Sequence, residues 1–245
     1  MRLLALLFCA VVGAGSAQAA CRQALALALD VSGSVDAREY RLQLDGLAQA
    51  LDSDSVRTAL MQQPQTPVLL SVYEWSGPDD NTLLVPWTPV TSEQGLDDII
   101  ATLRSTGRVP RSPGTGLGSS MRYGAALLEQ TDCARLTLDI SGDGKSNLGP
   151  RPRDVKTQLA GRAVTINALV IGADISATGD RRQAEISELS SYFRAEVIFG
   201  KDAFVETALG FEGYAEAMQR KLERELQVLV LGRLDGPKRG DLPDQ

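Results

Sequence analysis

The segment Asp30-Val-Ser32-Gly-Ser34 places one carboxylate and two hydroxyls at alternate positions. It directly follows an apolar run from Ala24 to Leu29, which predicts a buried strand. Polar residues at the carboxyl end of such a strand lie where open α/β sheets bind their ligands. Carboxylate and hydroxyl oxygens suit a hard cation such as Mg²⁺, which keeps several waters and takes few protein charges. The segment therefore predicts a metal site at the edge of a sheet.

Two further segments are expected to reach the same edge. Thr115 lies in a loop at residues 105–119 that is rich in Gly, Pro, Ser and Arg, and Asp143 follows an apolar strand at residues 135–140. If this strand is the parallel neighbour of the first, the two flank the switch point of a doubly wound sheet, where ligands bind. The loop that carries Thr115 precedes this strand by one helix, so it can fold over the same crevice.

These five side chains would bind the cation together, in different roles. We expect Ser32 and Ser34 to contact the ion directly. Asp30 and Asp143 would supply negative charge, directly or through water, and Thr115 would complete the set in one state of its loop. One position would stay open for the carboxylate of a partner, a preferred ligand of a hard cation.

The remainder of the chain alternates strands with helices, which is typical of a parallel sheet covered on both faces. The short turn at 76–81 predicts an antiparallel hairpin at the sheet edge. We therefore predict an α/β fold, a doubly wound, mostly parallel six-stranded sheet with one antiparallel edge strand and helices on both faces. Strands are expected at 24–29, 68–75, 82–87, 135–140, 164–171 and 195–199, and the main helices at 36–51, 92–103, 120–130, 154–161, 183–192 and 204–227.

Residues 1–19 have the features of an export signal: a positive charge at Arg2, an apolar core and a small-residue cleavage site at Ala17-Gln18-Ala19. The apolar core is shorter than the roughly 20 residues that span a bilayer. We expect an exported, soluble protein, periplasmic or secreted, that does not insert into a membrane. One domain is expected at 20–231, followed by a charged, disordered tail at 232–245.

Cysteine and histidine usage narrows the chemistry. The chain contains no histidine, which excludes Ser–His–Asp and Cys–His catalysis and histidine-ligated zinc. Cys9 leaves with the signal. Cys21 lies nine residues before Asp30, and Cys133 lies ten residues before Asp143. If the two strands are parallel neighbours, both thiols lie at the same, amino end of the sheet. In an exporting compartment this pair is predicted to form a disulfide, with two unpaired thiols as the alternative.

The charge balance argues against nucleic acid as a partner. The chain has 25 basic and 31 acidic residues and a formal net charge of −6, whereas nucleic-acid binding calls for a basic face. Three arginines, Arg104, Arg108 and Arg111, lie near or within the loop that carries Thr115. They could bind an acidic partner, but solvated charge is the expectation that we favour.

With these residues assembled, the chain resembles the von Willebrand factor A-like domains, whose metal-ion-dependent adhesion site is written D-x-S-x-S, then T, then D. It resembles more closely an uncharacterised exported bacterial family of this class, over roughly residues 23–226. The segments that carry the closer resemblance are Tyr73-Glu-Trp75, Asp139-Ile-Ser-Gly-Asp-Gly144, Ile166-Asn-Ala-Leu169 and Lys221-Leu-x-Arg-Glu225.

The resemblance implies a binding module without enzymatic activity. It would hold a divalent cation, Mg²⁺ before Mn²⁺ or Ca²⁺, and capture an Asp or Glu of an unidentified protein as a monomer. The alternative is a metal-dependent hydrolase or phosphotransferase that uses Asp30 as a nucleophile. Such enzymes usually carry a second Asp two residues on, where this chain has Ser32, and Lys145 is the only candidate catalytic lysine.

Overall fold

The computed structural model describes residues 20–172 and 179–234. The expected signal at 1–19 and residues 235–245 of the expected tail lie outside this range. The last described helix ends at Leu234, and the bounds of the domain and of the tail stay a prediction. Within the described ranges, no helix combines the length and the apolar character that crossing a membrane requires.

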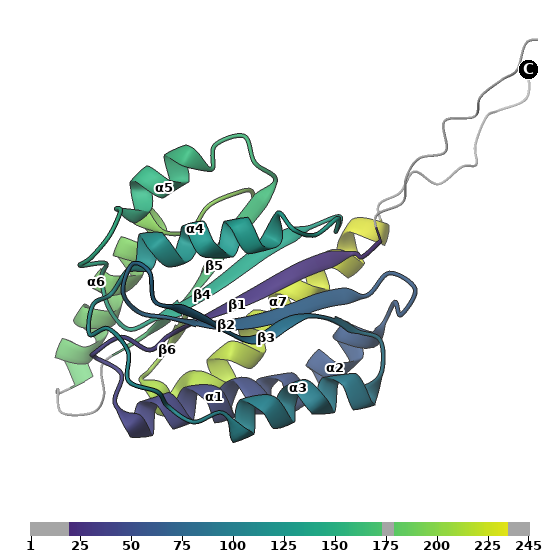
Figure 1. The fold of residues 1–245 in the computed structure, drawn as a ribbon, viewed down its shortest axis with the longest axis horizontal. Helices are drawn as coiled ribbons and strands as arrows, with labels where there is room; N and C mark the ends of the chain where they lie inside the picture. The colour runs from purple at the N-terminus through teal and green to yellow at the C-terminus, as the bar shows by residue number, and fades with distance from the viewer. Residues whose placement is uncertain (1–19, 173–178, 235–245) are drawn as a thin grey trace, which may run out of the picture.

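Six strands form one sheet (Figure 1). Their order across the sheet is β3-β2-β1-β4-β5-β6, and only β3 runs antiparallel to its neighbour. The predicted fold class is confirmed. The strands are β1 (Gln23–Asp30), β2 (Val68–Trp75), β3 (Asn81–Val90), β4 (Leu136–Gly142), β5 (Val164–Ile171) and β6 (Val205–Ala208).

Helices cover both faces of the sheet, and the alternation of β1 shows why the two faces differ. Its leucines, such as Leu27, point into one core with α1, α2, α3 and α7, while its alanines, such as Ala26, point into the other core with α4, α5 and α6. Small side chains on the second face let α4 approach β1 closely. The helices are α1 (Ala37–Asp52), α2 (Asp54–Met61), α3 (Glu93–Ser105), α4 (Leu117–Leu128), α5 (Pro152–Gln158), α6 (Gly179–Glu196) and α7 (Tyr214–Leu234).

The last strand is not where the sequence predicts it. Residues 195–199 finish helix α6 and the turn after it, and Val197 N donates to the carbonyl of Phe193 at 2.9 Å. Phe199 forms only an isolated bridge with Ile166. The true last strand, β6, has four residues of which three are half-buried. β6 is an edge strand without a continuous apolar run. A prediction based on hydrophobicity therefore places the strand at the more apolar residues 195–199 before it.

Cys21 and Cys133 form a disulfide at the amino ends of β1 and β4, with their Cα atoms 4.6 Å apart. The bond closes a loop of 112 residues. In the chain-entropy model a loop of this length contributes about 4–5 kcal/mol to stability by restricting the unfolded chain.

A buried ion cluster joins α7 to the middle of the sheet. Lys221 Nζ lies 2.7 Å from Asp139 Oδ1 on β4 and 2.8 Å from Glu225 Oε1, one helical turn further along α7. Asn167 on β5 donates to Glu225 at 2.6 Å and accepts from the backbone N–H of Phe204 at 3.1 Å. Three of the segments that carry the family resemblance therefore meet inside the protein, in a cluster with one cation and two carboxyl groups.

Candidate metal centre

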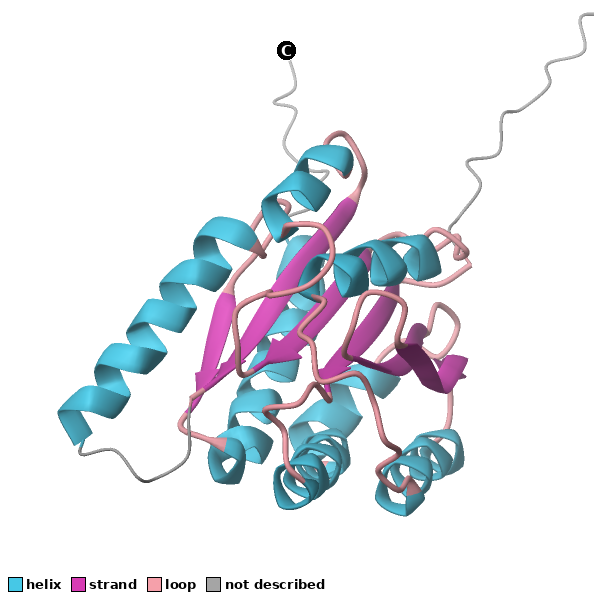
Figure 2. Cartoon of the chain, turned by 60° about the vertical axis from the view of Figure 1, so that its left-hand side comes forward, coloured by secondary structure: helices cyan, strands magenta, loops and turns pink. Residues whose placement is uncertain are grey.

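Strands β1 and β4 pair in parallel, with Ala28 opposite Ile140, so their carboxyl ends meet at one edge of the sheet. Figure 2 turns this edge toward the viewer, with the connecting loops in pink. After β1 the chain enters α1 on one face, and after β4 it enters α5 on the other. The two strands therefore flank the switch point of the sheet, where open α/β folds bind ligands.

The five residues singled out in the sequence gather at this edge. Ser34 Oγ donates to Asp143 Oδ1 at 2.7 Å, and Ser32 Oγ lies 3.3 Å from Ser34 Oγ. Thr115 Oγ1 donates to Ser32 Oγ at 3.4 Å. Asp30 begins the series, because its Oδ1 accepts from the backbone N–H of Ser32 at 2.9 Å.

Asp30 is fully buried, yet its second oxygen, Oδ2, has no hydrogen-bond partner among the described residues. Burial, and then the charge of Asp143, raise the pKa of Asp30 to about 8. Burial also raises the pKa of Asp143, against the hydrogen bond from Ser34. Within the described part of the chain, no lysine or arginine forms an ion pair with either carboxyl group. The two carboxyl groups are therefore held together without a protein cation between them.

This donor set fits a hard divalent cation. Two carboxylates and three hydroxyls offer oxygen ligands only, which Mg²⁺, Mn²⁺ and Ca²⁺ accept. Across residues 20–172 and 179–234, no group of three or more His, Cys, Asp or Glu is placed so that it could hold a metal ion. A cation here would thus depend on hydroxyl oxygens, and the unpaired Asp30 Oδ2 is the buried atom that a cation would satisfy.

The loop that carries Thr115 is fixed by backbone contacts on several sides. Gly33 N donates to the carbonyl of Pro113 at 3.1 Å, and Gly116 N donates to the carbonyl of Ser76 at 2.6 Å. A Cβ at Gly116 would lie 2.7 Å from a backbone carbon of Gly77, so this position requires glycine. The approach of three loops at this point explains why glycines lie between the polar residues.

A second polar group behind this loop was missed in the sequence. Glu74, 3 % exposed, accepts from Arg111 at 3.0 Å and from the hydroxyl of Tyr40 at 2.5 Å. Arg111 also reaches Asp80, which accepts from the backbone N–H of Ser112 at 2.8 Å. The available signal was a glutamate inside the apolar strand β2, because a buried carboxylate needs partners.

The expectation that the three arginines are solvated charges is wrong for Arg111. Arg111 is an internal ion-pair partner, with a side chain only 16 % exposed. Arg108 donates to the carbonyl of Val35, and Arg104 pairs with Asp52 at 3.0 Å. Arg104 and Arg108 are both exposed, so only Arg111 departs from the expectation.

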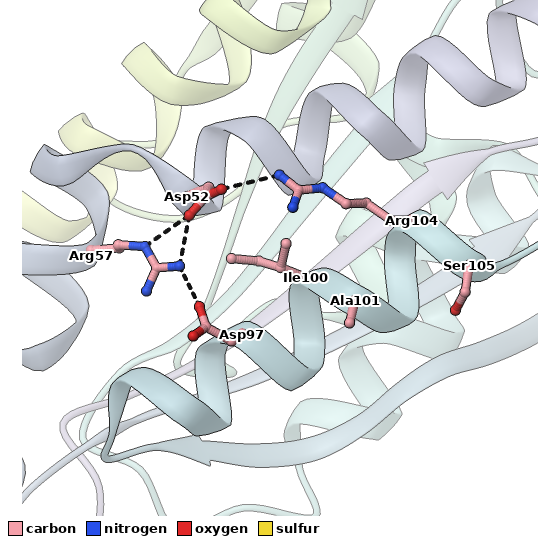
Figure 3. Close-up of a pocket in the computed structure, with 7 residues that line it drawn as sticks. All are labelled: Asp52, Arg57, Asp97, Ile100, Ala101, Arg104 and Ser105. Carbon is pink, nitrogen blue, oxygen red and sulfur yellow. Dashed lines mark hydrogen bonds and ion pairs between the residues drawn. The ribbon is translucent and has the colours of Figure 1, made fainter.

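A cavity of about 430 Å³ between α1, α2 and α3 lies away from this edge (Figure 3). Its charged residues bind one another: Arg57 lies 2.6 Å from Asp52 and 2.5 Å from Asp97. Arg104 pairs with the second oxygen of Asp52. With its charges paired in this way, the cavity is a packing feature of three helix ends and not a candidate site.

Solved structures of low sequence identity share this fold. The mussel byssus protein PTMP1, solved with a zinc-occupied MIDAS motif, aligns at 14 % identity and TM-score 0.58, over 84 % of this chain and 46 % of its own. The minor pilin PilB of Streptococcus sanguinis aligns at 14 % identity and TM-score 0.60, over 90 % and 64 %. BatB of Bacteroides thetaiotaomicron aligns at 11 % identity and TM-score 0.55, over 85 % and 98 %. The chain spans about half the length of the mussel protein.

These matches identify the fold as von Willebrand factor A-like and go no further, because all three identities are low. No curated protein matches the chain in sequence. A family model described as "Protein of unknown function (DUF1194)" matches residues 20–230. Since this match covers most of the sequence, the chain belongs to the DUF1194 family.

Proposed function

We propose that this protein is an exported binding module that holds a divalent cation at Asp30, Ser32, Ser34, Thr115 and Asp143. The cation would capture an Asp or Glu side chain of a partner protein. The observation that carries the proposal is the buried, unpartnered Oδ2 of Asp30 beside a second carboxyl group. Mg²⁺ is the cation that we favour, with Mn²⁺ or Ca²⁺ as alternatives.

The charge of the donor set favours binding of an external carboxylate. Asp30 and Asp143 together offset the two positive charges of the cation, and the three hydroxyls are neutral. Because the hydroxyls add no further negative charge, the cation would remain able to bind a third carboxylate, from the partner. The hydrogen bonds among Ser32, Ser34 and Thr115 keep the hydroxyl oxygens on one side of the carboxyl pair.

Similar structures support the same kind of function. The mussel protein carries zinc at its MIDAS motif, and a pilus adhesin, SpaC of Lactobacillus rhamnosus GG, shares the fold at TM-score 0.53. The Cys21–Cys133 disulfide supports export to the periplasm or the medium, because such bonds persist in oxidising compartments. We expect the module to act as a monomer.

Binding is favoured over a hydrolase or phosphotransferase that would use Asp30 as a nucleophile. Asp30 is fully buried, and its Oδ1 is held by the backbone N–H of Ser32. Lys145, the candidate catalytic lysine, is paired with Glu188 at 2.6 Å. Phosphatase activity that requires Mg²⁺ and disappears in Asp30→Asn would reverse this preference.

The test is calorimetric titration of Mg²⁺, Mn²⁺ and Ca²⁺ into metal-free protein lacking residues 1–19. Asp30→Asn is the test variant, and Asp132→Asn is the matched control, because Asp132 is exposed and precedes the amino end of β4. Binding to the parent and the control, lost in Asp30→Asn, is the expected result. Absence of binding to the parent, or equal binding to Asp30→Asn, would overturn the proposal.

A further inference from the structure

A second cavity of about 430 Å³ lies beside the candidate metal centre, between the β4–α5 loop and α6. The loop contributes Ser146, Asn147 and Arg151, and α6 contributes Tyr192. Both elements border the edge of the sheet that carries Asp143. A partner chain bound at the cation site could therefore extend into this cavity.

Two residues that line the cavity, Asn147 and Ser146, form hydrogen bonds with the backbone of Thr115. Asn147 Oδ1 accepts from the backbone N–H of Thr115 at 2.8 Å, and Asn147 N donates to the Thr115 carbonyl at 3.0 Å. Ser146 Oγ donates to the same carbonyl at 3.2 Å. Because its oxygen is engaged, the Asn147 side chain has only its two amide N–H donors left, and these make no hydrogen bond with a described residue.

The cations around the cavity differ in whether they are neutralised. Arg153 binds Glu196 through two nitrogens, one of them at 2.7 Å, and Lys145 binds Glu188 at 2.6 Å. Arg151, which is exposed and lines the cavity, forms no ion pair in the described ranges, and its charge makes only a minor contribution to the lowered pKa of Glu196. Its backbone is held against α4, since a Cβ at Gly118 would lie 3.3 Å from the Arg151 carbonyl carbon. The cavity thus offers unused donors, and its carboxylate, Glu196, is already paired.

We propose that this cavity is a second carboxylate subsite, in which Arg151 and the Asn147 amide bind an acidic side chain of the same partner. The ligand would then be a peptide segment with two acidic residues, one at the cation and one at Arg151. The guanidinium suits this role because its planar donors match a carboxylate. This inference rests on the proposed function, which supplies the first contact.

The test uses short peptides, acetylated and amidated so that only side chains carry charge. One series has a single Asp among glycines, and the other has two Asp separated by one to four glycines. Binding is followed by NMR titration of ¹⁵N-labelled protein in saturating Mg²⁺. We expect the best two-Asp peptide to bind about five- to tenfold more tightly than the one-Asp peptide, the size of one charge-assisted hydrogen-bonded contact.

Arg151→Gln is expected to abolish this preference while leaving Mg²⁺ affinity and one-Asp binding unchanged. Arg151→Lys should retain part of it. Arg122→Gln is the matched control, because Arg122 is exposed on α4, has no ion pair within the described residues and does not line the cavity. It should keep the full preference.

The outcomes separate the two proposals. Mg²⁺ binding with no preference for two carboxylates at any spacing, or a preference that persists in Arg151→Gln, overturns the subsite alone. Mg²⁺ binding without detectable binding of either peptide series also overturns the subsite. Failure of Mg²⁺ to bind the parent protein overturns the proposed function, and the subsite with it.

Discussion

Two aspartates four positions apart, Asp139 within β4 and Asp143 directly after it, have surroundings that differ in one respect. Asp139, in the middle of the strand, is buried with Glu225 and has the ammonium of Lys221 at 2.7 Å. Asp143, just after the strand, is close to Asp30 and has no protein cation beside it. Both regions bring two carboxyl groups together, but among the described residues only the interior pair has a protein cation beside it. The proposed function requires this difference, because it has the edge pair take its cation from solution.

The interior cluster also shows how full burial changes the ionisation of a carboxyl pair. One ammonium between two carboxylates leaves an excess negative charge, and burial raises the pKa of Asp139 to about 7, against the lowering effect of Lys221. The cluster relieves this charge by holding a proton over part of the pH range. Under the proposed function the edge pair would instead be neutralised by a divalent cation, which could reach it because Asp143 is partly exposed.

The largest expected effect comes from removing the interior cation. Lys221→Met leaves Asp139 and Glu225 buried without an opposite charge, which typically costs about 3–5 kcal/mol. Urea unfolding should show this loss. Arg220→Met, at the adjacent but exposed position that pairs with Glu206 at 3.1 Å, should change stability by no more than about 1 kcal/mol.

If Lys221→Met proves too unstable to purify, the double variant Lys221→Met/Glu225→Gln keeps the comparison testable. It removes one of the two unpaired carboxylates and should recover part of the lost stability. An unfolding free energy for Lys221→Met equal to that of the parent would show that the interior cluster does not depend on its cation.

The edge pair should behave in the opposite way. Asp30→Asn removes a buried carboxyl group that has no protein cation beside it among the described residues, so metal-free protein should lose little or no stability. The parent should gain about 2.7 kcal/mol from Mg²⁺ at one hundred times its dissociation constant, and Asp30→Asn should gain nothing. Thermal unfolding with and without Mg²⁺ measures both effects, and a variant still stabilised by Mg²⁺ would place the cation elsewhere.

The pH dependence of stability distinguishes the two regions further. A carboxyl group whose pKa is higher in the folded than in the unfolded state stabilises the fold at low pH, and this contribution is lost as pH rises. For Asp139 the loss should run from about pH 4 to about pH 7 and then level off. One proton gives a slope of at most about 1.4 kcal/mol per pH unit.

This slope is best measured in the Asp30→Asn background, in which Asp30 no longer contributes its own proton uptake. Adding Asp139→Asn should flatten the stability profile between pH 4 and pH 7. An unchanged slope would mean that Asp139 ionises normally inside the protein, and that the excess charge of the cluster resides elsewhere.

The edge could be predicted from the sequence, whereas the interior cluster could not. Asp30, Ser32 and Ser34 are adjacent in the chain, and their place after an apolar strand already fixes where they lie. Lys221 and Asp139 are far apart in sequence, and only the path of α7 across β4 brings them together. Strand β6 was missed for a related reason, because its pairing with β5 depends on neighbours rather than on its own residues.

The smallest expected effect concerns another buried carboxylate, Glu74, which accepts from the neutral hydroxyl of Tyr40 and from the charged guanidinium of Arg111. Tyr40→Phe removes the 2.5 Å hydrogen bond from the Tyr40 hydroxyl but leaves the ion pair with Arg111. We expect a loss of about 1 kcal/mol in the free energy of unfolding. Mg²⁺ affinity should change by less than about threefold, since Arg111 still holds the loop before Thr115.

Tyr123→Phe is the matched control for this variant. The Tyr123 ring packs edge-on against Tyr73 at a centroid distance of 4.9 Å, and its hydroxyl bonds no residue of the described ranges. It should unfold like the parent. Loss of Mg²⁺ binding in Tyr40→Phe would mean that the Glu74 cluster helps to form the proposed cation site. The Glu74 cluster and the cation site would then be one polar network and not two. Retained binding with a small stability loss is the expected result, because Glu74, like Asp139, already has its cation within the protein.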